Sequence, residues 1–324
     1  MSQEIPFIPF PFMENPHVQT VCNGLVLLSP KPPCVQRLIA LSDGDQISIE
    51  ISTPSGWTAD QPTVVLIHGL GGSSLSPNVV RMTHRLTALG IRAIRYNMRG
   101  CGSGKGLARR PYHSGRSDDL FEVLEKLKKE SPQSPFFLIG FSLGGNIVLK
   151  LTGELGAAGG KFIQGAIAVS PPADLFSSIR LFLEPENRYM HRYFCKLLRE
   201  EVLDRHQKFK DLPRVEIPRD INLYEFDQLY TAPQHGFESA EDYYSKCSSM
   251  HYVPDIGVPC RVLLSEDDPI ICHTSLDGVD LPSHVELYKT KKGGHMGYLG
   301  HPANGRGFYW LDSLLVDWIN ELNS

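Results

Sequence analysis

The stretch Phe136-Phe137-Leu138-Ile139-Gly140-Phe141-Ser142-Leu143-Gly144-Gly145-Asn146 decides the fold. An apolar run enters it, and a helical pattern over residues 146–155 follows it. A strand, a sharp turn and a helix in this order make a Gly-x-Ser-x-Gly match a nucleophile elbow, which raises the serine at the end of a sheet. The helix would direct its positive amino end at the same point. We therefore predict that Ser142 is a nucleophile. The alternative is a structural turn around a buried serine.

A serine nucleophile needs a base, and the base needs an acid that orients it. Residues 260–264 predict a buried strand that leads to Asp267 and Asp268, and residues 285–288 predict another that leads to the Gly-Gly turn before His295. This order, with the acid after a late strand and the histidine after the last one, suits a Ser-Asp-His arrangement. We expect His295 to be the base and favour Asp268 as the acid. Asp267 remains the alternative acid, although it is better suited to hydrogen bonding within its loop.

An oxyanion hole has candidate donors in two loops. The β-branched run 63–67 predicts a strand, and His68-Gly69-Leu70-Gly71-Gly72 follows it. The backbone N–H groups of Leu70 and Leu143 would converge on the developing oxyanion. A plain strand-to-helix turn is the alternative. Neither G-x-G-x-x-G nor G-K-[ST] is present in this turn, so a nucleotide site is not expected, and we predict neither a cofactor nor a metal.

Several motifs together resemble the YheT-like branch of the α/β-hydrolases, which also contains the ABHD1- and ABHD3-type eukaryotic proteins and the yeast ethyl-ester synthases. The matching stretches are Asn15-Pro16-His17-Val18-Gln19-Thr20, His68-Gly69-Leu70-Gly71-Gly72-Ser73-Ser74, Arg99-Gly100-Cys101-Gly102, Gly140-Phe141-Ser142-Leu143-Gly144-Gly145-Asn146, Asp267-Asp268-Pro269 and Gly293-Gly294-His295. The first is the most specific to the branch. The resemblance implies an α/β-hydrolase fold, a triad of Ser142, Asp268 and His295, and carboxylic-ester chemistry. The eukaryotic members resemble membrane-anchored proteins, whereas no anchoring helix is expected here.

The composition suits an enzyme of the cytoplasm. The chain has 324 residues, of which 41% are hydrophobic and 21% are charged, enough for one large α/β domain with an insertion. The sequence has no apolar run of membrane-spanning length and no signal-peptide pattern, so no integral membrane segment is expected. Seven scattered cysteines without C-x-x-C spacing predict reduced thiols. A net charge of −4 argues against general nucleic-acid binding. The oligomeric state is left open.

The chain is predicted to have three parts. Residues 1–34 are Pro-rich without a helical period, and we expect an extended arm that packs on the core or under a lid. A membrane-dipping arm is the alternative, which the prolines disfavour. Alternating strand and helix patterns in 35–170, resumed in 253–324, predict a mostly parallel sheet with helices on both faces. Residues 171–252 break this alternation and predict a helical lid, most of whose aromatic residues would form its own small core, while a few line an acyl pocket.

These observations favour a serine esterase that acts on small acyl esters of short to medium chain length. An acyltransferase that passes the acyl group to an alcohol would use the same residues, and a lipase or phospholipase acting on lipid esters is a further alternative. A non-catalytic binding protein that retains the fold is the third. A dehalogenase or epoxide hydrolase is disfavoured, because those enzymes use aspartate where this chain has Ser142.

Overall fold

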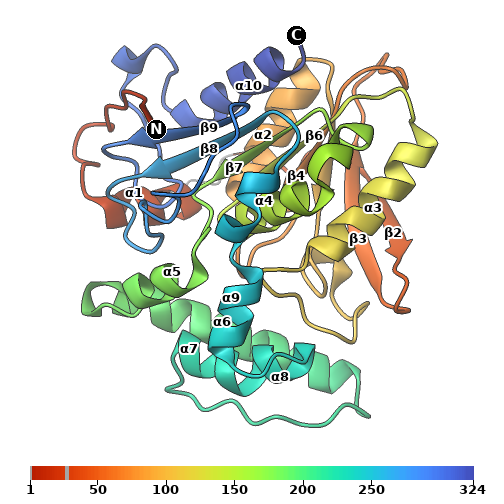
Figure 1. The fold of residues 1–324 in the computed structure, drawn as a ribbon, viewed down its shortest axis with the longest axis vertical. Helices are drawn as coiled ribbons and strands as arrows, with labels where there is room; N and C mark the ends of the chain where they lie inside the picture. The colour runs from red at the N-terminus through yellow and green to blue at the C-terminus, as the bar shows by residue number, and fades with distance from the viewer. Residues whose placement is uncertain (1, 26–28) are drawn as a thin grey trace.

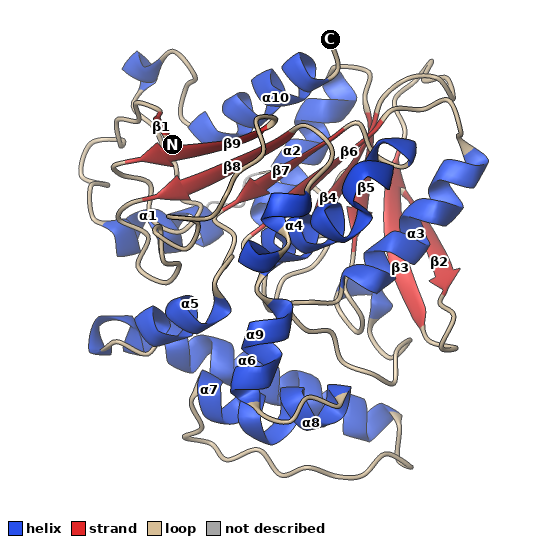
Figure 2. Cartoon of the chain, viewed as in Figure 1, coloured by secondary structure: helices blue, strands red, loops and turns tan. Residues whose placement is uncertain are grey.

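The computed structural model describes residues 2–25 and 29–324, in which the strands form one sheet with the order β1-β9-β8-β7-β6-β4-β5-β3-β2 (Figures 1 and 2). Neighbouring strands are parallel except in the pairs β2–β3 and β3–β5. The strands are β1 (Gln3–Glu4), β2 (Val35–Ala40), β3 (Gln46–Ser52), β4 (Thr63–Ile67), β5 (Arg92–Tyr96), β6 (Phe136–Phe141), β7 (Gly165–Val169), β8 (Cys260–Ser265) and β9 (Val285–Thr290). The predicted mostly parallel sheet is confirmed.

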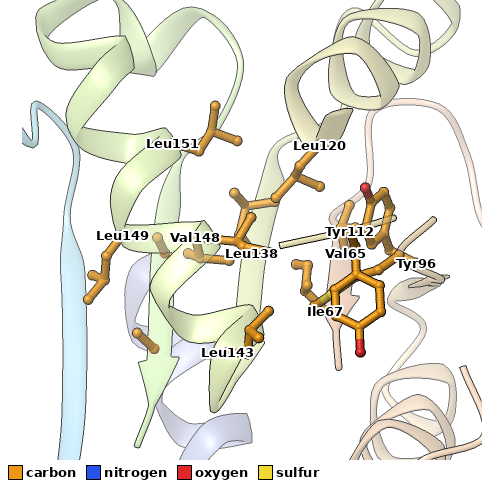
Figure 3. Close-up of a cluster of buried hydrophobic side chains, with 14 of the residues drawn as sticks. Val65, Ile67, Tyr96, Tyr112, Leu120, Leu138, Leu143, Val148, Leu149 and Leu151 are labelled. Atoms are coloured by element: carbon orange, nitrogen blue, oxygen red, sulfur yellow. The ribbon is translucent and has the colours of Figure 1, made fainter. Parts of the chain in front are cut away.

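Helices cover both faces of this sheet, because alternate side chains of a buried strand point to opposite faces. In β4, Val64 and Leu66 pack with α2 (Pro77–Ala88) and α10 (Trp310–Leu322). Val65 and Ile67 belong to the cluster on the other face, with α3 (Ser117–Glu130) and α4 (Leu143–Leu155). Figure 3 shows part of that second cluster, in which Val65, Ile67 and Leu138 of the sheet lie near Leu120 and Val148 of the helices. The central strands are apolar throughout because both of their faces are buried.

The loops that follow four of the parallel strands lie at the same edge of the sheet. Ile67 pairs with Gly140 in β6, and Ser265 pairs with Thr290 in β9, so these strands end at similar heights. The loops that follow β4, β6, β8 and β9 therefore meet at the carboxyl edge, where open α/β sheets commonly place their sites.

A helical insertion lies at this edge, between β7 and β8. It contains α5 (Leu175–Phe182), α6 (Arg188–Lys208), α7 (Leu223–Phe226), α8 (Ala232–His235) and α9 (Ala240–Cys247). Figure 1 shows these helices, coloured green to cyan, below the sheet. The insertion, which we call the lid, has its own cluster of buried side chains around Tyr243 and Tyr244.

The prediction of an arm without helix is wrong for Pro16–Leu25, which form α1. The Asn15 side chain accepts hydrogen bonds from the N–H groups of His17 at 2.9 Å and Val18 at 3.3 Å, as an N-cap does. Pro16 occupies the first turn, where its missing N–H costs nothing. The extended arm was predicted because the segment is rich in proline. The Asn15 cap and the position of Pro16 in the first turn nevertheless allow a helix to form. Residues 1 and 26–28 of the predicted arm lie outside the described residues.

The remainder of the arm also contacts the core. Gln3 and Glu4 form β1, which pairs in parallel with β9. The Phe7 ring packs edge-on against Tyr298 and Trp310, with centroid distances of 5.3 and 5.2 Å. Phe12, by contrast, is 99% exposed. None of the helices formed by residues 2–25 and 29–324 has both the length and the apolar character needed to cross a membrane.

Candidate active site

Ser142 lies on a sharp turn between β6 and α4. Its backbone has φ 53° and ψ −122°, a conformation that a residue with a side chain rarely adopts. A Cβ on Gly140 would collide with the carbonyl oxygen of Gly144, and a Cβ on Gly144 would collide with that of His68. The turn therefore requires both glycines of the motif. It leaves the Ser142 side chain just before the amino end of α4.

Ser142, His295 and Asp268 form one hydrogen-bonded chain. His295 Nε2 lies 2.9 Å from Ser142 Oγ, and His295 Nδ1 lies 2.8 Å from Asp268 Oδ2. The other Asp268 oxygen accepts the N–H groups of Ile270 at 3.0 Å and Ile271 at 2.9 Å, which fixes the carboxylate. With its Nδ1–H directed at Asp268, a neutral His295 has Nε2 available to accept the Ser142 proton. The structure thus brings together the three residues that the sequence singled out, and each is buried.

Asp267 faces away from His295 Nδ1 and joins the two loops that carry the acid and the histidine. Its Oδ1 accepts hydrogen bonds from Ser265 Oγ at 2.6 Å and from the Gly294 N–H at 2.9 Å. The two adjacent carboxylates therefore have different surroundings: Asp268 contacts the imidazole, and Asp267 contacts the backbone next to it.

The loop after β4 passes directly beside Ser142. A Cβ on Gly69 would lie 3.1 Å from Ser142 Cβ. Among the described residues, no acceptor is present for the N–H of Leu70 or of Leu143. Two backbone donors next to a serine hydroxyl can stabilise the oxygen anion of a tetrahedral intermediate.

His68 holds this loop in place as a neutral side chain. Its ring nitrogens lie 2.8 Å from the Gly69 carbonyl oxygen and 3.1 Å from the Met98 backbone nitrogen. Nδ1–H therefore donates to Gly69, and Nε2 accepts from the Met98 N–H. Complete burial lowers the pKa of His68 to about 4. His68 has no solvent access and is a structural residue of the loop.

Helix α1 binds the loop that carries His295. Thr20 Oγ1 accepts the N–H of His295 at 2.9 Å, and Asn23 Nδ2 donates to the Met296 carbonyl oxygen at 2.9 Å. The fully buried Gln19 amide accepts the Leu299 N–H at 2.9 Å and donates to the Leu299 carbonyl at 3.1 Å. Side chains of the arm thus form hydrogen bonds to the backbone of the histidine loop at three places.

This loop needs such support because its backbone is strained. Met296 and Tyr298 have φ values of 58° and 45°, which are unfavourable for residues with side chains. Helix α1 approaches so closely that a Cβ on Gly297 would lie 2.7 Å from Gln19 backbone atoms. From the sequence, Gln19 and Thr20 were recognised only as part of a branch-specific motif, and their contacts with the histidine loop were not predicted. Their polarity within an otherwise apolar arm was the available signal.

Two cavities flank the Ser142–His295 pair. One, which we call the groove, has a volume of about 510 Å³ and lies between α1 and the start of α6; its lining includes Val21, Leu70, Tyr193, Phe194 and His295. The other, which we call the inner pocket, has a volume of about 140 Å³ and lies under the lid; its lining includes Ser142, Leu143, Ile179, Phe182, Ile270 and His295. Both are lined mainly by apolar side chains, so the site can accept an uncharged, apolar molecule.

Comparison with known proteins agrees with this geometry. A family described as "alpha/beta hydrolase fold" matches residues 62–302. The Escherichia coli (strain K12) protein named "Putative esterase YheT" is 31% identical, over 98% of this chain and 94% of the relative. The human "Phospholipase ABHD3" is 27% identical, over 86% of this chain and 71% of the relative. A "Monoacylglycerol lipase" of Saccharomyces cerevisiae is 29% identical, over 77% of this chain and 57% of the relative.

Solved structures share the fold at lower identity. The 2,6-dihydroxy-pseudo-oxynicotine hydrolase superposes with a TM-score of 0.60 at 16% identity, over 94% of this chain and 71% of that one. Est1E of Butyrivibrio proteoclasticus, solved with ferulic acid, superposes with a TM-score of 0.59 at 15% identity, over 88% of this chain and 98% of that one. At these identities the likeness establishes the fold alone.

Proposed function

This chain belongs to the α/β-hydrolase family, in its YheT-like branch, and we propose on that premise that it is a serine hydrolase that cleaves carboxylic esters through an acyl-enzyme. The hydrogen-bonded chain from Asp268 through His295 to Ser142 carries the proposal. The relatives named as an esterase, a phospholipase and a lipase support ester chemistry. The apolar linings of the groove and of the inner pocket support an ester without charge near its carbonyl group.

The proposed reaction has two halves. Ser142 Oγ attacks the ester carbonyl carbon while His295 Nε2 takes the hydroxyl proton, and the N–H groups of Leu70 and Leu143 stabilise the resulting oxyanion. His295 then gives the proton to the leaving alcohol, and the acyl group remains on Ser142. A water molecule, deprotonated by the same imidazole, attacks the acyl-enzyme and releases the acid. The Asp268 carboxylate stabilises the imidazolium that forms.

The test is turnover of p-nitrophenyl butyrate by a Ser142→Ala variant. We expect kcat to fall by at least ~10³-fold, because the covalent step is lost while binding and the oxyanion donors remain. Ser178→Ala is the matched control, since Ser178 is a buried serine of the same inner pocket whose hydroxyl donates to the Asp174 carbonyl. The control should keep kcat within a few-fold. Activity of Ser142→Ala within a few-fold of the parent, at an unchanged melting temperature, would refute the proposal.

A further inference from the structure

Only one of the two cavities is lined by the candidate nucleophile. The groove contacts His295 but neither Ser142 nor Leu143. The inner pocket contacts all three of these residues. Past Leu70 and Leu143 a third cavity of about 90 Å³ extends the inner pocket deeper under the lid, and its lining includes neither Ser142 nor His295. We call this third space the far cavity.

The direction of proton transfer orients an ester in these spaces. Within the proposed function, His295 gives its proton to the oxygen of the leaving alcohol, so that oxygen must lie next to His295 Nε2. The carbonyl oxygen must point at the N–H groups of Leu70 and Leu143. The acyl chain then extends from the carbonyl carbon on the side away from His295. His295 and Leu70 line both the groove and the inner pocket, but only the inner pocket is lined by Ser142. The inner pocket is therefore the space next to the acyl group on Ser142, and the groove is left for the alcohol.

The far cavity is small, about 90 Å³, and charged side chains interrupt its mainly apolar lining. Its lining includes Glu201, Arg205 and Asp227 of the lid. Arg205 is buried and donates to the Tyr230 hydroxyl at 2.5 Å, and Asp227 accepts a hydrogen bond from the Tyr244 hydroxyl at 2.8 Å. Burial raises the pKa of Glu201 to about 7 and that of Asp227 to about 6. A methylene group packed against these side chains would remove polar groups from solvent without offering them a hydrogen bond.

We propose that this site takes esters whose leaving alcohol is the larger apolar part and occupies the groove, while a shorter acyl chain occupies the inner pocket and ends before the far cavity. The proposal rests on the proposed esterase function and adds the substrate class to it. It assigns chain-length selection to Ile179 of α5 and alcohol selection to Val21 of α1. Ile179 lines both the inner pocket and the far cavity, and Val21 lines the groove only.

Two series of ester substrates, tested on the whole protein, show which cavity binds the acyl chain and which binds the alcohol. In the first, p-nitrophenyl esters run from acetyl to dodecanoyl; in the second, butyrate esters run from methyl to decyl alcohol. In the acyl series, kcat/KM should rise by about fourfold for each buried methylene and then fall once the chain reaches the far cavity. In the alcohol series it should continue to rise to the longest members. An acyl series that keeps rising to dodecanoyl, with an alcohol series that falls early, would overturn the assignment.

Three variants test whether Ile179 selects the acyl chain and Val21 selects the alcohol. Ile179→Phe should move the acyl optimum to shorter chains and Ile179→Ala should move it to longer ones, with the rank order of the alcohols retained. Val21→Phe should reduce the preference for decyl over methyl butyrate by about tenfold and retain the acyl optimum; Val21 is 47% exposed, so the larger ring is not forced into a packed core. Leu203→Ala, on the exposed face of α6, is the control that should alter neither series.

The outcomes separate this inference from the proposed function. A fluorophosphonate probe that labels Ser142, combined with Ile179 variants that change the alcohol series in place of the acyl series, overturns the inference and leaves the esterase intact. A parent protein that neither reacts with the probe nor cleaves any member of the two series overturns both. Probe labelling together with the expected shifts supports the inference.

Discussion

The two sides of the candidate active site differ in the contacts that line them: hydrogen bonds dominate on one side and apolar packing on the other. On the His295 side, α1 and the Asp267 carboxylate form hydrogen bonds with loop backbone, through buried groups such as the Gln19 amide. On the lid side, apolar contacts line the cavities: the rings of Phe182 and Phe194 pack at 5.6 Å, and a Cβ on Gly71 would lie 2.9 Å from the Leu197 side chain. Hydrogen bonds such as that from Asn187 Nδ2 to the Pro269 carbonyl oxygen, at 2.6 Å, also join the lid to the core. Hydrogen bonds are directional, whereas apolar packing tolerates changes of shape when volume is conserved. The histidine side is therefore suited to fixing reactive atoms, and the lid side to selecting what binds.

The largest expected effect tests the histidine side at its two adjacent carboxylates. Asp268→Asn should lower kcat by roughly 10³–10⁴-fold, because an amide cannot stabilise the His295 imidazolium or hold the correct tautomer. Asp267→Asn is the matched variant one residue away. It should lower kcat by about tenfold, since it weakens the hydrogen bonds to Ser265 and Gly294 and removes the ion pair with Lys292. Steady-state kinetics at equal melting temperature measures both. A larger loss in Asp267→Asn would reverse the two roles.

The next effect concerns the buried amide of α1. Gln19→Leu should lower the free energy of unfolding by about 2–5 kcal/mol, because the Leu299 N–H and the Met13 carbonyl lose their partner inside the protein and the Leu299 carbonyl keeps only the Phe10 N–H. Urea unfolding measures this loss. Gln36→Leu, on the surface of β2, is the control and should change stability little, since the Gln36 contacts are more exposed. Equal stability of the two variants would show that α1 is not needed to hold the histidine loop.

Thr20 allows the same side to be tested without a large loss of stability. Thr20→Val keeps the shape of the side chain but removes the oxygen that accepts the His295 N–H. We expect kcat to fall by about tenfold with a small change in KM, because the imidazole is less precisely positioned. Thr20→Ser retains the oxygen and should restore kcat. A loss confined to KM, or one that serine does not restore, would contradict a positioning role.

The lid side should respond differently. Phe194→Ala enlarges both the groove and the inner pocket at their shared wall. We expect KM for apolar esters to rise several-fold while kcat stays within about threefold, because no group that contacts the reacting atoms is removed. A kcat loss as large as that of Thr20→Val would remove the distinction between the two sides.

The smallest effect is a pH dependence confined to the lid. Burial raises the pKa of Asp227 to about 6, and the Tyr244 hydroxyl donates to its Oδ2 at 2.8 Å. Between about pH 4 and pH 6 the folded state therefore holds more protons than the unfolded state, so Asp227 lowers the free energy of unfolding as pH rises through this window. Melting curves at pH 4.5 and 6.5 should show a smaller drop for Asp227→Asn than for the parent. Identical drops would show that Asp227 titrates normally.

The sequence predicted the parts of the fold whose signal is local. The predicted strand 63–67 coincides with β4, since five consecutive buried residues are apolar or β-branched. The pattern after Ser142 likewise predicted α4, with a start three residues late. By contrast β1 is only two residues long and pairs through its backbone, so no side-chain pattern marks it. Helix α1 was missed because its cap lies among prolines that favour extended chain.

The candidate site likewise contains features that the sequence could predict and features that it could not. The Gly-x-Ser-x-Gly turn is a local steric requirement, so sequence alone could identify Ser142. The choice between Asp267 and Asp268 depends on which carboxylate faces His295, and adjacent residues carry the same sequence signal. The contact of Gln19 with Leu299 joins residues 280 positions apart, and such a contact is visible only once the fold is known.

The central claim is that Ser142 is the activated nucleophile of this protein. Its most direct test is reaction of the native chain with a fluorophosphonate probe, followed by intact-mass measurement and peptide mapping. We predict one adduct per chain, on Ser142, with no adduct on Ser142→Ala or on heat-denatured protein, because activation requires the assembled hydrogen-bonded chain to His295 and Asp268. Absence of an adduct on the folded parent, or equal labelling of Ser142→Ala, would contradict it.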